Sequence, residues 1–191
     1  LEIKGTSIGT DDSYGNAISA TNITKVENSK IYGTISVSGI KTDFNNVTIT
    51  TASPNSYEVV NAQPSVDNAE YSFKDCVITG ANGSNQAGIR GCAHNYSDTK
   101  INFDNVVIEN CKYDLYSIIS GKTFEMNIVN VPDGENYILG SNHDAGDNGP
   151  IFICSENFVD RLILEGKAGY GLVAEEYGNG YGVFYIPLEI S

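Results

Sequence analysis

A six-residue motif recurs along this chain and limits the folds that it can adopt. The strong copies are FNNVTI at Phe44–Ile49, FKDCVI at Phe73–Ile78 and FDNVVI at Phe103–Ile108. A weaker copy, VENSKI, lies at Val26–Ile31, and a shorter one, IVNV, lies at Ile128–Val131. The strong copies begin 29 and 30 residues apart, and the next step is 25. A period of this size is typical of stacked structural repeats in a solenoid.

The residues around the third strong copy show how one repeat is built. Apolar and polar side chains alternate over residues 101–104 and again over 106–109, which predicts two strands with one buried face each. Between them lies Asn105, and Asn or Asp best tolerates the left-handed backbone of a sharp bend. Its counterparts in the other repeats are Asn28, Asn46, Asp75 and Asn130.

A third strand is expected later in each repeat, near Tyr116–Ile119. The corresponding segments of the other repeats are Tyr57–Val60, Ala87–Arg90 and Tyr137–Gly140. Three strands and three bends make one triangular coil, and coils of this kind stack their strands in parallel about 4.8 Å apart. The stacking predicts one internal row of Phe44, Phe73 and Phe103, a second row of Ile49, Ile78 and Ile108, and side-chain hydrogen bonds between the bend asparagines.

Three strands per coil with an Asn or Asp bend at positions 28, 46, 75, 105 and 130 resemble the right-handed parallel β-helix of the pectate-lyase-like superfamily. In character the repeats are nearest to those of bacterial cell-surface and adhesin β-helix proteins. The resemblance implies an all-β, single-stranded right-handed solenoid of about six to seven coils with terminal caps. We expect one domain, with residues 1–21 as a cap or first irregular coil, 22–150 as regular coils, and 151–191 as the last coils and C-terminal cap.

Composition and charge narrow the range of partners. The chain of 191 residues carries 24 acidic and 11 basic residues, a net charge of -13, which disfavours binding to nucleic acid. No apolar run approaches the roughly 20 residues of a membrane span, so membrane insertion is not expected.

Abundant Asn, Ser, Thr, Gly and Tyr favour an extracellular or cell-surface protein. A start at Leu1 and a single methionine, Met126, favour a mature form or an excised piece of a larger chain over a native start.

The four cysteines do not form a CxxC pair, which disfavours a zinc site. Cys76 takes the place of Val47 and Val106 in the repeat, so we expect a buried thiol that acts as a small apolar side chain. A disulfide between Cys92 and Cys111 on neighbouring coils is an alternative that the sequence leaves open.

In pectate-lyase-like enzymes the substrate lies along one face of the coils, bordered by long loops. The resemblance therefore directs attention to Arg90, His94 and Asp98, and to His143 two coils on, roughly 10 Å away on the same rim. A lyase needs a base to abstract a sugar proton and a cation to stabilise the intermediate, and Arg90 or His94 could supply one of these roles. The catalytic motifs of the superfamily are missing, so the histidines are equally well explained as solvated loop residues.

Two further sets of residues are candidate binding sites. Asp144 and Asp147, within the Asn- and Gly-rich segment 142–149, could hold a calcium ion with help from Asp98, although turn formation explains these residues equally well. No other cofactor is expected. Four tyrosines among C-terminal glycines offer ring faces for sugars, unless they cover the core and cap. They are Tyr170, Tyr177, Tyr181 and Tyr185.

The favoured interpretation is a non-catalytic, extracellular β-helix domain of a bacterial surface protein, acting in adhesion, carbohydrate contact or as a structural stalk. Its partner would be a glycan or another ligand of a host or cell surface. The alternative is a polysaccharide lyase or glycoside hydrolase with its site on the rim near Arg90, His94 and Asp144.

Overall fold

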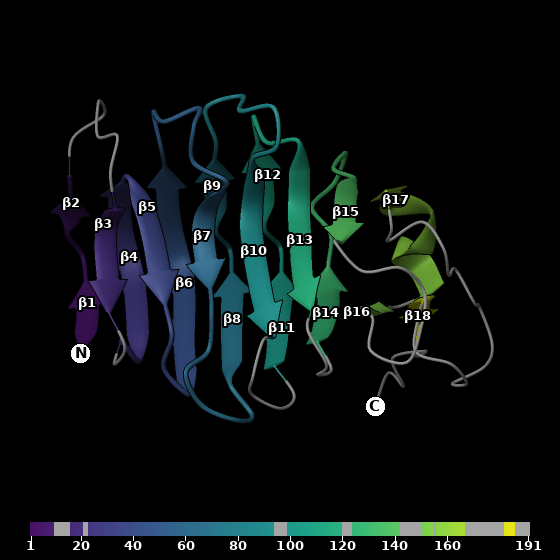
Figure 1. Ribbon diagram of the computed structural model, residues 1–191, viewed down its shortest axis with the longest axis horizontal. Helices are drawn as coiled ribbons and strands as arrows, with labels where there is room; N and C mark the ends of the chain where they lie inside the picture. The colour runs from purple at the N-terminus through teal and green to yellow at the C-terminus, as the bar shows by residue number, and fades with distance from the viewer. Residues whose placement is uncertain are drawn as a thin grey trace.

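The structure, a computed structural model, is an all-β solenoid with two parallel sheets facing each other (Figure 1). It describes residues 1–9, 16–20, 23–93, 99–119, 124–141, 150–154, 156–166 and 182–185. The strands and the single 3-10 helix of these residues are β1 (Glu2–Lys4), β2 (Ser7–Ile8), β3 (Asn16–Ala20), β4 (Lys25–Tyr32), β5 (Thr34–Val37), β6 (Lys41–Thr50), β7 (Glu58–Ala62), β8 (Glu70–Lys74), β9 (Val77–Thr79), β10 (Ala87–Ala93), β11 (Thr99–Asp104), β12 (Val107–Glu109), β13 (Tyr113–Ile119), β14 (Phe124–Asn130), β15 (Tyr137–Ser141), β16 (Pro150–Cys154), η1 (Glu156–Arg161), β17 (Leu162–Gly166) and β18 (Gly182–Tyr185).

The chain passes from one sheet to the other and back in every coil. The 11-stranded sheet has the order β1-β4-β6-β8-β11-β14-β16-β18, with β2 beside β4, and β9 between β6 and β12. The 7-stranded sheet has the order β17-β15-β13-β10-β7-β5-β3, and the pairs are parallel in both sheets. In Figure 1 the chain advances from left to right, with front strands pointing down and rear strands pointing up. This winding is that of the predicted right-handed parallel β-helix.

The repeat register is the one that the motif predicted. Val26, Phe44, Phe73, Phe103 and Ile128 pair in successive coils, and so do Ile31, Ile49, Ile78 and Ile108. The three expected strand segments are present, for example as β8, β9 and β10. The first two segments of each coil belong to one sheet, however, because β4 and β6 continue through the bend.

The predicted bends are confirmed at four positions and wrong at the fifth. Asn28, Asn46, Asp75 and Asn105 have φ angles of 47°, 53°, 52° and 57°. Asn130 stays within β14 and is not among the positive-φ residues of the described chain. The register slips there, because Phe103 pairs with Ile128 while Asp104 pairs with Asn130, which leaves one extra residue in β14.

The bend side chains form hydrogen bonds from coil to coil, as expected. Asn46 Nδ2 donates to Asn28 Oδ1, and Asn105 Nδ2 donates to Asp75 Oδ1, each at 2.7 Å. Because of the slip in β14, Asn130 Nδ2 donates to Asp104 Oδ1 rather than to Asn105, also at 2.7 Å.

The interior is filled by the stacked apolar rows. The rings of Phe73 and Phe103 stack with centroids 5.8 Å apart, and Tyr137 from the opposite sheet packs against Phe103 at 6.2 Å. Cys76 is buried in this core, as predicted, and its thiol donates to the carbonyl of Lys74. Burial raises the pKa of that thiol to about 11.

The alternative of a Cys92–Cys111 disulfide is wrong, since Cys111 is a free thiol. Cys92 pairs with Ile118 within the 7-stranded sheet. Cys111 lies instead at the bend before β13, close to Gly80 of the coil before. The two cysteines therefore occupy different corners of the coil.

The first residues of the chain contribute a paired coil. Strands β1 and β2 both pair with β4, and β3 pairs with β5, so the described part of residues 1–21 follows the coil path. In this coil Ile3 pairs with Val26 and Ile8 pairs with Ile31. Gly5, with a φ of 58°, takes the position of the bend asparagine.

Candidate functional site

The outer face of the 7-stranded sheet carries a row of large polar and aromatic side chains. Asn61, Arg90 and Tyr116 are paired in register on β7, β10 and β13. Their strand neighbours Ile89 and Leu115 are fully buried. Because successive side chains of a strand point to opposite faces of the sheet, the row itself faces outward. The row crosses three coils and therefore presents side chains from three distant segments of the sequence at one place.

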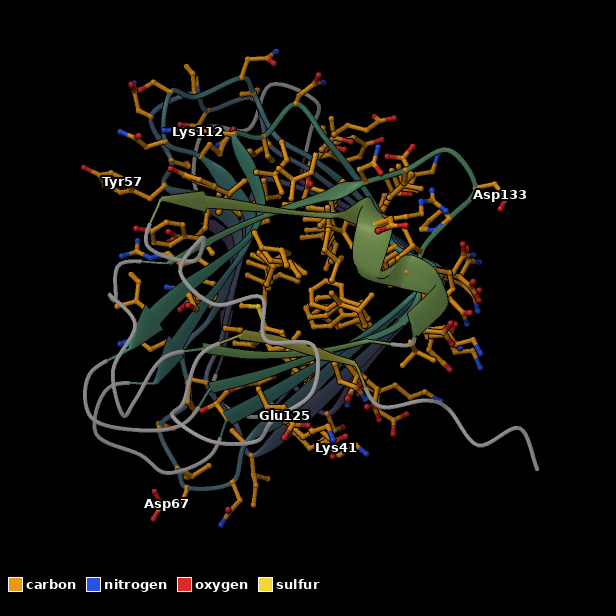
Figure 2. All side chains as sticks on the ribbon, turned by 90° about the vertical axis from the view of Figure 1, so that its right-hand side faces the viewer. Lys41, Tyr57, Asp67, Lys112, Glu125 and Asp133 are labelled. Atoms are coloured by element: carbon orange, nitrogen blue, oxygen red, sulfur yellow. The ribbon has the colours of Figure 1, made fainter. Side chains whose placement is uncertain are left out.

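A groove of about 340 Å³ lies on this face. Figure 2, which looks along the stack of coils, shows Tyr57 pointing away from the interior at one corner. Tyr57 is 67% exposed. The residues that line the groove are Tyr57, Asn85, Arg90, Tyr113, Tyr116 and Ile118.

Two tyrosines of β13 form one wall of the groove. The rings of Tyr113 and Tyr116 lie 5.0 Å apart at an angle of 47°. Both rings lie over Gly140 of the next coil, where a Cβ atom would come within 2.7 Å of each. Gly140 pairs directly with Tyr116. Because glycine has no side chain, the two rings can pack against the backbone of the sheet at this position.

Arg90 is held by groups of the preceding coil. Its Nη1 atom lies 2.9 Å from Glu58 Oε2, and its Cζ atom lies 5.8 Å from the centre of the Tyr57 ring. Both members of the ion pair are partly screened by the protein, with 29% and 20% of their side chains exposed. Among the described residues, buried Arg90 Nε and Asn61 Oδ1 have no hydrogen-bond partner. Polar atoms in this condition can be satisfied by a ligand or by water.

Gln86 fixes the loops beside the groove. Its buried side chain donates from Nε2 to the carbonyls of Ser53 at 2.9 Å and Ser56 at 3.1 Å, in the coil before. Its Oε1 atom accepts from the backbone N–H of Ala81 at 2.7 Å. Its backbone carbonyl accepts from Lys112 N at 2.8 Å, in the coil after. One side chain and its backbone therefore connect three coils at the point where Tyr57 and Asn85 emerge.

A smaller polar hollow of about 190 Å³ adjoins the groove. It lies over two turns of neighbouring coils, each closed by a backbone hydrogen bond, from Ser56 N to Ser53 O and from Gln86 N to Gly83 O. The hollow shares Tyr57 and Asn85 with the groove. Its lining residues are Pro54, Asn55, Ser56, Tyr57, Ser84, Asn85 and Gln86.

Of the site residues predicted from the sequence, Arg90 lies in the groove. Tyr185 belongs to β18 and pairs with Cys154, but its side chain is outside the described set. The remaining predicted residues lie outside the described part of the chain: His94, Asp98, His143, Asp144, Asp147, Tyr170, Tyr177 and Tyr181. The calcium site and the C-terminal tyrosine platform therefore stay predictions. Among residues that the structure does describe, no group of three His, Cys, Asp or Glu is placed to hold a metal.

The sequence interpretation missed Tyr57, Tyr113 and Tyr116 as site residues. The signal for Tyr116 is its position in a predicted strand next to the inward Leu115, which directs the Tyr116 ring to the outer face. The sequence does not show that these rings converge on one groove. Tyr57 and Tyr116 belong to different coils, and the absence of a side chain at Gly140 allows the rings of Tyr113 and Tyr116 to lie where they do.

Comparison with protein-family models, with curated proteins and with solved structures gives no match to this chain. Within the described segments, no helix has the length and apolar character needed to cross a membrane.

Proposed function

We propose that this chain is a non-catalytic, extracellular β-helix domain that binds carbohydrate through the groove around Arg90. The observation that carries the proposal is the cluster of Tyr57, Tyr113 and Tyr116 around one arginine on the outer face of a sheet. The likeness of the repeats to those of bacterial cell-surface and adhesin β-helices supports a role in adhesion or surface contact.

The chemistry of the groove suits a sugar. A sugar ring has an apolar C–H face that packs on an aromatic ring and hydroxyl groups at its edge that need hydrogen-bond partners. Tyrosine supplies an apolar plane with a polar tip. Arg90 and Asn85, which line the same groove, supply hydrogen-bond donors and an acceptor, and Glu58 holds the Arg90 side chain in place.

The scaffold holds these groups with little freedom. Tyr113, Tyr116 and Arg90 stand on strands paired on both sides, and Gln86 anchors the loops of Tyr57 and Asn85. A preformed site loses less conformational entropy on binding than one built from mobile loops.

The test is a glycan-binding screen followed by titration calorimetry with the strongest ligand, on the wild type and on Tyr57→Ala and Tyr116→Ala. Each variant should weaken binding at least about tenfold, which corresponds to about 1.4 kcal/mol. Tyr32→Ala, which removes a half-buried tyrosine from β4 on the other sheet, is the matched control and should bind as the wild type does. Unchanged affinity in both groove variants would refute the proposal. Cleavage of a bound glycan would favour the enzyme alternative.

A further inference from the structure

We infer that the groove and the adjoining polar hollow together bind an uncharged oligosaccharide of more than one sugar unit. The inference rests on the proposed function and names the class of glycan.

The groove and the hollow adjoin each other. The aromatic groove and the polar hollow share Tyr57 and Asn85, so the two lie side by side and one ligand that spans these residues contacts both. At about 340 Å³ the groove is at the lower end of ordinary ligand sites, and the hollow is smaller still. A single sugar would leave one of the two unused, whereas a short chain fills both.

The groove and the hollow offer different contacts to a ligand. Tyr57, Tyr113, Tyr116 and Ile118 make the groove a surface for sugar faces. The hollow offers amide and hydroxyl groups on two stacked turns, with Asn55, Ser84 and Asn85 exposed. These groups can exchange hydrogen bonds with sugar hydroxyls in either direction. The stacked turns repeat the same chemistry one coil apart, which suits a polymer with repeated hydroxyls.

The charges around the groove favour an uncharged ligand. Arg90 is the cation among the groove-lining residues, and Glu58 compensates it at 2.9 Å. Lys112 is exposed at the margin, where its Nζ atom lies 4.8 Å from the centre of the Tyr113 ring, so water and salt screen its charge. Figure 2 shows Lys112 and Tyr57 near the same corner. With a net charge of -13 on the whole chain, a carboxylated glycan gains little here and is repelled at long range.

The experiment compares two sets of oligosaccharides by calorimetry. The neutral set contains cello-, manno- and xylo-oligosaccharides, and the acidic set contains oligogalacturonates, each from the monosaccharide to the hexasaccharide. Affinity for the best neutral series should rise at least about tenfold from the monosaccharide to the tetrasaccharide. Oligogalacturonates of equal length should bind at least about tenfold more weakly at low salt.

Two variants separate the parts of the site. Asn55→Ala combined with Ser84→Ala alters only the exposed turns of the hollow, and should flatten the rise of affinity with oligosaccharide length. Tyr116→Ala should weaken every length alike. Thermal unfolding of each variant checks that the coil stack is intact.

The outcomes distinguish this inference from the proposed function. Oligogalacturonate binding that is tighter than neutral binding, and is lost in Tyr116→Ala, overturns the inference and keeps the groove as a sugar site. Equal affinity for monosaccharide and tetrasaccharide also overturns the inference and keeps the groove as a sugar site. Absence of binding to either set, or binding that Tyr116→Ala leaves unchanged, overturns both.

Discussion

The rings of Phe44 and Phe73 lie parallel within 3°, with their centroids 4.7 Å apart, one coil above the other. Their backbones pair directly in β6 and β8, so the ring separation follows the strand spacing. Phe73 also stacks on Phe103 and is almost fully buried. It is therefore the central ring of the internal aromatic row.

Replacing Phe73 with alanine should lower the free energy of unfolding by about 3–5 kcal/mol, because a large cavity opens between two rings that cannot close on it. The measurement is urea denaturation followed by circular dichroism. Lys74→Ala is the control, since this neighbouring side chain is exposed and its ion pair with Asp104 is worth at most about 1 kcal/mol. A loss below about 1 kcal/mol for the Phe73 variant would show that the row does not support the coils.

Asn46 combines a left-handed backbone with a side-chain hydrogen bond to Asn28. In Asn46→Ala both contributions are lost, and we expect a cost of about 1–3 kcal/mol in the free energy of unfolding. Asn46→Gly keeps the backbone conformation and should cost less than the alanine variant. The exposed neighbour Asn45 serves as a control, because Asn45→Ala changes neither feature. Equal losses in the alanine and glycine variants would mean that backbone conformation contributes nothing at this bend.

Asp114 should make stability depend on pH. Burial raises the pKa of Asp114 from 3.8 to about 7, and the charge of Glu135 adds to the rise. The N–H of Ile138, which donates to Asp114 Oδ2 at 2.6 Å, partly offsets this rise. Because the unfolded chain releases this proton near pH 4 and the folded chain only near pH 7, the free energy of unfolding should fall as pH rises between these values. The total effect is on the order of a few kcal/mol.

The check is denaturation from pH 4 to pH 8 with Asp114→Asn. The amide keeps an acceptor for Ile138 but cannot ionise, so the variant should lose this part of the pH dependence and be more stable than the wild type at pH 8. Asp133→Asn, in the exposed turn labelled in Figure 2, should retain the wild-type dependence. Identical pH profiles for the Asp114 variant and the wild type would contradict the role of this carboxyl.

Gly140→Ala tests the groove without altering a residue that lines it. The new methyl group would strike the rings of Tyr113 and Tyr116, which must then move outward. We expect glycan affinity to fall by about threefold or more while the melting temperature changes little, because both rings are partly exposed and can give way. Wild-type affinity in this variant would show that the placement of the two rings is unimportant for binding. The control is Ser36→Ala, in the same outward row of the sheet two coils before Arg90, and it should bind as the wild type does. Gly134→Ala is less suitable as a control, because the φ of 85° at Gly134 would add backbone strain.

The architecture was predictable because it depends on short-range patterns repeated at one period. Phe44, Phe73 and Phe103 stack, and Asn28, Asn46, Asp75 and Asn105 bend, since each residue has the same local surroundings in its own coil. The copy at Ile3–Ile8 was missed because glycine replaces the bend asparagine, although the spacing of its two isoleucines is that of the other copies. Asn130 was misplaced because one extra residue shifts the register of β14, and a single insertion leaves the sequence pattern nearly unchanged.

The sequence by itself thus determined the stack of parallel coils, because side-chain alternation and left-handed bends are properties of neighbouring residues. Only the tertiary structure decided that Cys111 stays a free thiol, that Glu58 pairs with Arg90, and that Tyr57 and Tyr116 border one groove. These relationships join residues of different coils, and they depend on how the corners of those coils superimpose. The period of the repeat shows which coils are neighbours. The strand register and the side-chain packing decide which atoms of two neighbouring coils come into contact.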